Sequence, residues 1–209
     1  MTRLDRRSPN KGDARRSDLL EALDALLKDG VPLEDINIAQ LSERAGVTRS
    51  AFYFYFENKP MAVIALLEQM YDDVALATDR LLDTTVDPNE RIRSVIASLF
   101  DSVDHQPHAY RALLEARASS ATVREDWARG LAGFAEEVAA MIRAERKASN
   151  AIAGPDADAL AAVLLDLNDR AVERYALGGG PEREQHIDAL TAIWVRTIHG
   201  ADREKGEGR

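Results

Sequence analysis

The sequence predicts an all-α protein of about nine helices, and three observations support this fold class. Apolar residues recur at spacings of three, four and seven, and no segment shows the two-residue alternation typical of a strand. Short segments with glycine, proline or capping residues separate the periodic stretches. The chain has 209 residues, 45% of them hydrophobic and 30% charged, which is enough for a small N-terminal domain on a larger helical body.

The first third of the chain predicts one long and two short helices. A helix from about residue 14 to residue 29 places Leu19, Leu23 and Leu26 on one face, and Gly30 is a natural terminator. A connector covers residues 31–37. Two short helices are then expected over 39–45 and 48–55, broken at Gly46-Val47.

Three further helices are predicted in the middle of the chain. Residues 60–81 form a long helix with Pro60 in its first turn, where the missing N–H has no partner to lose. Asp87 is expected to cap the next helix, and Pro107 to start a short one. Residues 122–125 resemble a capping box. It would open a helix whose apolar face carries Val123, Trp127, Leu131, Phe134, Val138 and Met141.

Two final helices are expected over about 156–177 and 182–199. The segment 178–181 joins them and supplies a C-terminal glycine and an N-terminal proline. The resulting plan has a basic flexible arm (1–13), a small helical domain (14–73), a larger helical domain (74–200) and a polar tail (201–209).

The composition excludes several kinds of chemistry. No cysteine is present, so disulfides, thiol nucleophiles and cysteine-ligated metals are excluded. There is no glycine-rich phosphate loop, nucleophile elbow or catalytic triad, so we expect neither an enzyme nor a cofactor. No apolar run reaches membrane-span length, and the start of the chain lacks a signal peptide's apolar stretch, which predicts a cytoplasmic protein. The histidines lack metal-ligand spacing and are expected at the surface: His105, His108, His186 and His199.

Charge is distributed unevenly along the chain. The net charge is −9, but residues 1–59 hold ten basic and ten acidic side chains, so the whole excess lies in residues 60–209. Residues 1–16 have a local charge of +4. An acidic body would repel phosphates and orient a neutral head with a basic arm toward DNA. The alternative for the first dozen residues is a solvated, disordered tail.

Residues 36–59 carry the pattern most relevant to function. A small core of Ile38, Leu41, Ala45, Val47, Ala51 and Phe52 would clamp two helices at a steep angle, with Gly46 in the turn. Thr48 is a good N-cap for the second helix, so Arg49 and Ser50 project from its first turn. That end of a recognition helix reaches base edges in the major groove.

The aromatic run from Phe52 to Phe56 cannot all be buried. Phe52 and Phe56 share a helix face and are expected in the core, whereas Tyr53 points about 100° away. Tyr53 and Tyr55 are therefore candidates to donate hydrogen bonds to phosphates. Phe54 has no assignment from the pattern. Lys59, at the start of the next helix, is a candidate phosphate contact.

These segments resemble a known family. AlaGlnLeuSerGluArgAlaGlyVal (39–47) followed by ThrArgSerAlaPheTyrPheTyrPheGluAsnLys (48–59) is similar to the signature of the TetR family of bacterial regulators. Segments 116–120, 126–129, 143–146, 167–170 and 193–198 are similar to its EthR-like subgroup, so the resemblance covers nearly the whole chain. It implies a TetR-like fold, a homodimer on a palindromic operator, a four-helix bundle formed by the last two helices with their symmetry mates, and a ligand tunnel. Residues 14–73 would then be the DNA-binding domain, with its helix-turn-helix at about 37–56, and residues 74–200 the ligand-binding and dimerisation domain.

The resemblance also implies site residues. The positions matching DNA contacts are Thr48, Arg49, Ser50, Tyr53, Tyr55 and Lys59, while Phe54 replaces a residue that is polar in many relatives. The positions matching tunnel-lining residues are Leu99, Val103, Trp127, Phe134, Asn168, Asp169 and Trp194. Leu99 and Val103 replace aromatics, and Glu137 and Glu173 stand where a tyrosine and a phenylalanine are expected, which implies a differently shaped and charged cavity.

Alternatives remain open for the body. Trp127 and Trp194 fit a core as well as a pocket, and the polar pair Asn168-Asp169 needs a partner, which could be a ligand, the other subunit or a neighbouring side chain. The function expected is a repressor that a small apolar or amphipathic effector releases from DNA, with residues 60–81 as the lever. The rivals are a DNA-binding dimer without an effector and, from another class, a helical enzyme acting on a hydrophobic molecule.

Overall fold

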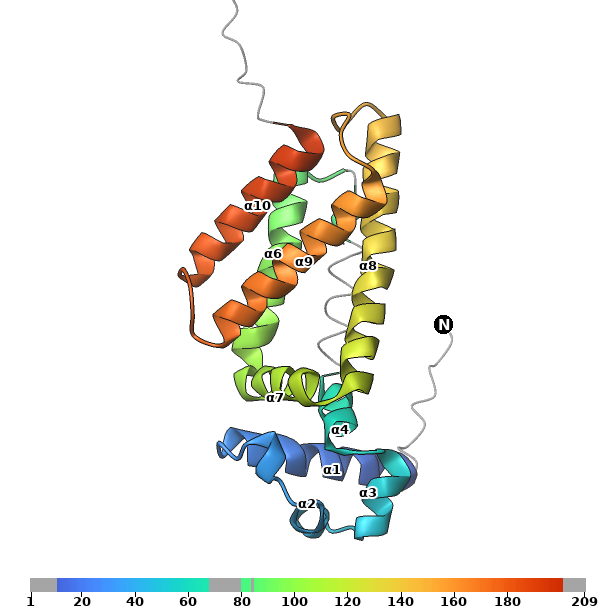
Figure 1. Cartoon of the computed structure of the whole chain (residues 1–209), viewed down its shortest axis with the longest axis vertical. Coiled ribbons are helices and arrows are strands. Elements are labelled where there is room, and N and C mark those ends of the chain that lie inside the picture. The colour runs from blue at the N-terminus through green and yellow to red at the C-terminus, as the bar shows by residue number, and fades with distance from the viewer. Residues whose placement is uncertain (1–10, 68–79, 84, 201–209) are drawn as a thin grey trace, which may run out of the picture. The chain divides into compact units, whose positions relative to one another are not determined.

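The computed structural model describes residues 11–67, 80–83 and 85–200. Within these ranges it contains nine α-helices, one short 3-10 helix and no strand (Figure 1), which confirms the predicted all-α class. Most of the predicted basic arm, the middle of the predicted 60–81 helix with Tyr71 and Val74, and the polar tail lie outside the described residues.

The described residues divide into two compact units. One takes those within Met1–Gln69 and His108–Arg124, and the other takes those within Met70–Pro107 and Glu125–Arg209. The first unit therefore includes a segment that the sequence assigned to the body. Each unit has its own buried apolar core.

The first unit begins with α1 (Lys11–Lys28), the 3-10 helix η1 (Leu33–Asp35), α2 (Ile38–Arg44), α3 (Arg49–Tyr55) and α4 (Lys59–Leu66). Helix α1 contacts α2 and α4, and α2 contacts α3. Leu19, Leu23 and Leu27 are buried, so Leu27 takes the core position expected for Leu26. Gly30 ends the first helix as predicted, with a φ of +81° that favours glycine.

Helix α7 (Pro107–Ser119) lies almost wholly in the first unit, where two long-range contacts hold it. The backbone N–H of Leu33 donates to the Glu115 carboxylate at 3.0 Å. His108 Nε2 lies 2.6 Å from the Asp24 carboxylate on α1. Burial acts to raise the pKa of Asp24, but hydrogen bonds from Lys28 and His108 outweigh it and hold that pKa below its usual value.

The second unit contains α6 (Pro88–His105), most of α8 (Ala121–Lys147), α9 (Ala157–Ala176) and α10 (Arg183–His199). Helices α9 and α10 contact each other and both contact α6 (Figure 1). The predicted cap of α6 is confirmed, because the Asp87 side chain accepts from the N–H of Asn89 at 2.9 Å. Asp156 caps α9 in the same way and accepts from the N–H of Ala159 at 2.9 Å.

Two predicted helix starts are wrong in detail. The predicted capping box at Thr122 does not open α8, because the helix already begins at Ala121 and the Ser120 hydroxyl accepts from the N–H of Val123 at 3.4 Å. Pro181 is not the first residue of α10 either. Glu182 caps that helix, and its own N–H donates to the Gln185 side chain at 3.1 Å.

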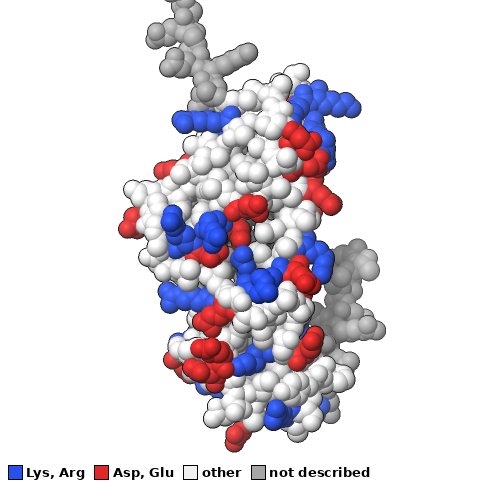
Figure 2. All heavy atoms as spheres, in the orientation of Figure 1, with Lys and Arg blue, Asp and Glu red and all other residues white. Residues whose placement is uncertain are grey.

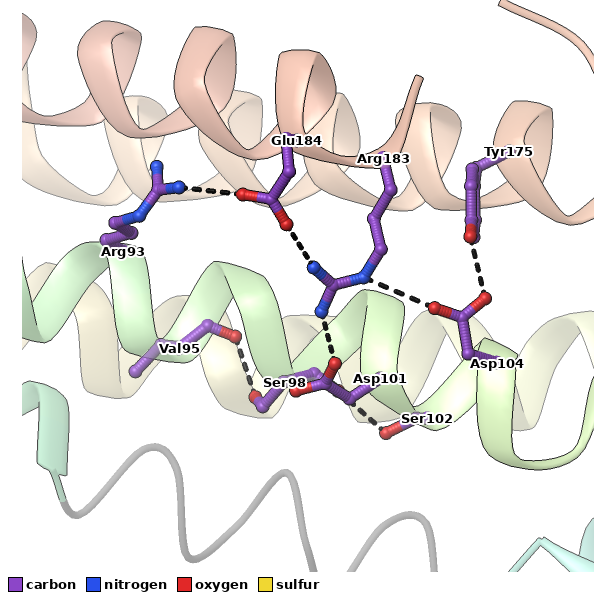
Figure 3. Close-up of polar contacts among 9 residues, drawn as sticks. All are labelled: Arg93, Val95, Ser98, Asp101, Ser102, Asp104, Tyr175, Arg183 and Glu184. Atoms are coloured by element: carbon purple, nitrogen blue, oxygen red, sulfur yellow. Dashed lines mark hydrogen bonds and ion pairs between the residues drawn. The ribbon is translucent and has the colours of Figure 1, made fainter. Parts of the chain in front are cut away.

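Polar contacts between α6 and α10 fasten these helices along one edge of the second unit (Figure 3). Arg183 pairs with Asp101, Asp104 and Glu184, and Arg93 donates to Glu184 at 2.9 Å. These ion pairs are exposed to solvent, so each adds little stability. They connect the first turns of α10 to α6 at several points.

Tyr175 adds a link from α9 to the same edge. Its hydroxyl donates to the Asp104 carboxylate at 2.6 Å (Figure 3), and this hydrogen bond, with burial, raises the pKa of the phenol. The Tyr175 ring also meets Phe100 edge-on at 5.3 Å. All three helices of the α6–α9–α10 layer are thus connected by side chains.

Three histidines contradict the prediction of surface positions. His186 is buried, with its ring 5.6 Å from that of Phe100. His108 is mostly buried beside Asp24, and the His199 side chain is about one-tenth exposed. Only His105 is exposed. A lone histidine on a helix carries no sequence signal that separates these cases, because its partners come from other helices.

Candidate functional site

The turn between α2 and α3 fixes where the second helix begins. Gly46 has a φ of +66°, which glycine adopts without strain, and its N–H donates to the Glu43 carbonyl at 3.0 Å. Thr48 then caps α3, because its hydroxyl accepts from the N–H of Ala51 at 3.2 Å. Sequence and structure agree here, and the turn presents the first residues of α3 to solvent.

The aromatic run divides as the periodicity predicts. Phe52 and Phe56 are buried and their ring centroids lie 5.6 Å apart. Leu41 of α2 is also buried. The other predicted core residues of this motif are only partly buried: Ile38, Ala45, Val47 and Ala51. One face of α3 is therefore anchored by two phenylalanines, and the opposite face stays open.

The predicted base-contacting residues lie on that open side. Thr48, Arg49 and Ser50 are exposed. Arg49 lies over the ring of Tyr53, 5.7 Å from its centroid, and its guanidinium is 3.4 Å from the Tyr53 hydroxyl. Tyr55 is half-buried. Arg49 and Tyr53 therefore form one joined polar and aromatic pair on the exposed side of α3.

Phe54, which the pattern left unassigned, is the most exposed large hydrophobic residue in the part of the chain that the structure describes, at 81%. Its ring meets the Tyr55 ring edge-on, with centroids 5.0 Å apart. The site residues named from the sequence did not include it. The sequence did contain a signal for its exposure, because a residue two positions after the buried Phe52 lies on nearly the opposite face of the helix.

Lys59 makes contacts that its sequence position does not indicate. Its ammonium donates to the carbonyls of Glu34 at 2.7 Å and Ile36 at 2.9 Å, so it fastens the start of α4 to the connector after α1. Two of its three N–H groups are therefore engaged within the protein. A phosphate contact through the third stays a prediction.

Charge near the helix-turn-helix is mixed. Arg16 lies over the Phe56 ring at 5.6 Å, and Arg44 pairs with Asp29 at 3.3 Å. On the face drawn in Figure 2, basic and acidic side chains are interspersed. No patch of one sign stands out on that face. The acidic excess of residues 60–209 is therefore not concentrated on the face drawn there.

The predicted pocket residues form two bonded pairs. The Trp194 indole N–H donates to the Asn168 side chain, and the Trp127 indole N–H donates to Asp169, each at 3.1 Å. Asn168 and Trp194 are buried, whereas Trp127 and Asp169 are partly buried. A neighbouring side chain, one of the three alternatives, therefore provides a partner for each polar residue.

The remaining pocket candidates are less uniform. Val103 is buried, and Leu99 and Phe134 are half-buried. Of the two acidic departures, Glu137 is exposed and Glu173 pairs with Arg170 at 3.0 Å. The structure thus brings Asn168 together with Trp194 and Asp169 together with Trp127, and the shared pocket stays a prediction.

Thr191 of α10 was missed by sequence reasoning. It is only 4% exposed, and its hydroxyl has no hydrogen-bond partner within the described structure. It lies one turn before Trp194 on the same helix face. A buried hydroxyl without a partner costs stability, so folding alone does not account for a threonine at this position.

Metal and membrane sites are not indicated in the described ranges. There, no three histidine or acidic side chains cluster closely enough to hold a metal ion. No helix in the same ranges combines the length and apolarity needed to cross a bilayer.

An all-helical chain with an exposed, capped second helix in a helix-turn-helix and a separate helical unit defines a TetR-type regulator. Comparison with known proteins agrees. Residues 92–200 match the family described as "Transcriptional regulator EthR, C-terminal domain". The chain is 31% identical to the HTH-type transcriptional regulator EthR of Mycobacterium tuberculosis over 92% of its own length and 90% of that protein. It is 30% identical to EthR of Mycolicibacterium smegmatis, over 90% and 88%.

Solved structures show the same fold. NalD, a secondary repressor of a multidrug efflux pump in Pseudomonas aeruginosa, matches with a TM-score of 0.69 at 19% identity, over 93% of this chain and all of that one. A TetR-family regulator from Rhodococcus matches with a TM-score of 0.65 at 17% identity, over 88% and 98%. The chain belongs to the EthR-like branch of the TetR family of helix-turn-helix transcriptional regulators.

Proposed function

We propose that this protein is a homodimeric repressor that binds a palindromic operator through α3 and is released by a small apolar or amphipathic effector. The observation that carries the proposal is the open face of α3. Arg49 and Ser50 are exposed beside the Thr48 cap, whereas Phe52 is buried. Arginine at such a position can donate two hydrogen bonds to guanine.

Dimerisation is supported by apolar side chains left exposed on α9 and α10. Val163 is 64% exposed, and Leu167 and Ile193 are also exposed. A second copy of these two helices would cover them and form a four-helix bundle. Two copies of α3 would then meet successive major grooves when about 34–36 Å apart.

Effector binding is supported by the buried polar groups of the second unit. Among the described residues the Thr191 hydroxyl has no hydrogen-bond partner, and the buried Asn168 side chain accepts from Trp194. SmeT of Stenotrophomonas maltophilia, which shares the fold (TM-score 0.63 at 17% identity, over 94% of this chain and 96% of that one), has been solved as a complex with triclosan. An effector that binds better when the two α3 helices are mis-spaced would release the operator.

DNA binding is tested by selecting duplexes from a random-sequence pool with the full-length protein. We expect an inverted repeat to be enriched. Arg49→Ala should lose about 1–3 kcal/mol on the selected duplex and lose preference at one position in each half. Arg129→Ala, which removes an exposed arginine of α8, is the matched control and should bind normally. Equal weakening by Arg49→Ala on selected and random DNA contradicts base recognition.

The effector is tested by thermal unfolding with a panel of apolar and amphipathic compounds that includes triclosan. A compound that binds the folded protein raises Tm in proportion to its occupancy and should lower affinity for the selected duplex. A compound that raises Tm without affecting DNA binding contradicts the release mechanism. If no compound does either, the effector-free DNA-binding dimer is favoured.

Catalysis is not part of the proposal, because the matched relatives are transcriptional regulators. The site of action is the bacterial cytoplasm, where the operator is located. Turnover of any compound that binds, abolished by Thr191→Val, would favour the helical enzyme instead. Valine has almost the same shape as threonine and removes only the hydroxyl.

A further inference from the structure

The outermost position of α3 is apolar, which folding does not require. Successive residues of an α-helix are rotated by about 100°, so Phe54 lies about 160° from the buried Phe52. Ser50 lies about 160° from Phe52 in the other direction. These two residues therefore point most directly away from the core of the first unit. Phe54 is 81% exposed there.

The neighbouring ring gives Phe54 a defined orientation. Its ring meets Tyr55 edge-on at 5.0 Å, and Tyr55 is itself half-buried beside Phe56, with centroids 6.4 Å apart. Edge-to-face ring pairs are favourable. Phe54 thus packs on Tyr55, which itself packs on the buried Phe56.

A phenylalanine ring offers DNA only apolar contact. On the floor of the major groove, the C5 methyl of thymine is the apolar group that distinguishes one base pair from the others. Phosphates would instead select a hydrogen-bond donor such as the neighbouring Tyr53. Phe54 shares with Ser50 the face of α3 that points away from the core. An apolar residue on that face is suited to contact base edges.

We propose that Phe54 packs against the C5 methyl of a thymine in each operator half-site and makes the protein select thymine at that position. The inference rests on the proposed operator binding and adds a sequence preference that hydrogen-bond donors do not provide. A serine or asparagine in place of Phe54 would leave the fold intact and lose this preference.

The test removes the methyl from the DNA and the ring from the protein separately. In the duplex selected by the wild-type protein, each symmetric pair of thymines is replaced in turn by deoxyuridine, which keeps the base pair and lacks only the methyl. One pair should weaken wild-type binding about fifteenfold, or about fourfold per half-site, as expected for burial of one methyl group. Phe54→Ala should bind the unmodified duplex more weakly and be indifferent to that replacement.

Leu177→Ala is the matched control, because Leu177 is 62% exposed and lies in the second unit. It should keep the full deoxyuridine effect. Thermal unfolding of Phe54→Ala should match that of the wild type, since the ring is exposed. If the affinity losses from deoxyuridine and from Phe54→Ala are independent and multiply at every thymine pair, the inference is overturned. The same independent losses are expected if Phe54 inserts between bases or contacts another protein.

The outcomes separate this inference from the proposed function. If the wild-type protein enriches no sequence, operator binding itself is refuted, and the Phe54 contact with it. If an operator is enriched and Arg49→Ala loses base preference while Phe54→Ala keeps its sensitivity to deoxyuridine, operator binding stands and the Phe54 contact is refuted.

Discussion

Replacing Lys59 by methionine should destabilise the first unit, because Lys59 joins two segments far apart in sequence. Its ammonium donates to the Glu34 carbonyl at 2.7 Å, which is exposed, and to the Ile36 carbonyl at 2.9 Å, which is partly buried. Methionine keeps most of the side-chain length and removes both donors. The exposed carbonyl regains water, whereas the partly buried one does so incompletely, so we expect a loss of about 2 kcal/mol in the free energy of unfolding.

The assay is thermal unfolding at fixed protein concentration, together with hydrogen exchange of the connector after α1. A loss of about 2 kcal/mol corresponds to a Tm lower by about 4–8 °C in a chain of this size. Backbone amides near η1 should exchange faster, because their segment has lost its anchor. Lys147→Met, at an exposed position in the last turn of α8, should leave both measurements unchanged.

The competing interpretation of Lys59 is a phosphate contact. It predicts unchanged unfolding and, on DNA, a drop of about one in the slope of log affinity against log salt concentration. Unchanged Tm and unchanged exchange in Lys59→Met would refute the structural role. The same variant therefore separates the two interpretations without an effector.

Three further changes test other contacts. Trp194→Phe should cost about 1–3 kcal/mol, because the buried Asn168 side chain loses its indole donor; a loss equal to that of Trp127→Phe, whose ring is only partly buried, would contradict this. Arg183→Met should leave the folding of the second unit nearly unchanged, by at most about 1 kcal/mol in urea unfolding, since its pairs are solvent-exposed; a loss of several kcal/mol would show otherwise. Asp24 has a depressed pKa when folded, so its contribution to stability is present above about pH 4 and is lost as pH falls through the folded value. The difference in unfolding free energy between wild type and Asp24→Asn should therefore shrink below about pH 4, and a constant difference from pH 3 to pH 6 would contradict it.

The helix ends were the most predictable part of the fold. Thr48 and Asp87 cap helices where the sequence placed them, because a cap needs only one side-chain oxygen and the N–H groups two or three residues on. Thr122 failed by two positions, since Ser120 carries an equally good hydroxyl. Local chemistry decides whether a cap can form, while the packing of the whole helix decides which one does.

Contacts between distant segments were not predictable. Nothing near Glu115 indicates that its carboxylate accepts from the N–H of Leu33, which lies 82 positions earlier. That contact and the His108–Asp24 pair place α7 in the first unit, whereas an apolar periodicity is the same in either unit. A single domain boundary at residue 73 cannot assign residues 108–124 to the first unit, because they follow that boundary in the sequence.

The pocket candidates show an intermediate case. The sequence indicated that Asn168 and Asp169 needed partners, because polar groups on an apolar helix rarely stay unpaired. It could not say that Trp194 and Trp127 would supply them, since each pair joins two helices. Thr191 gave no signal at all, because a threonine in an amphipathic helix usually donates to its own backbone.

The exposed apolar residues that remain connect the fold to its function. Burial of Phe52 and Phe56 accounts for why α3 forms and where it packs, and a polar residue at position 54 would fold equally well. The same holds for Val163 on α9, which is 64% exposed. The stability of the fold therefore leaves both exposed residues unexplained, and the proposed function gives each a partner: DNA for Phe54 and a second copy of the chain for Val163. If the protein binds its operator as a symmetric dimer, the preference for thymine must appear twice, in inverted orientation. A selected duplex with thymine preference in only one half would contradict that link.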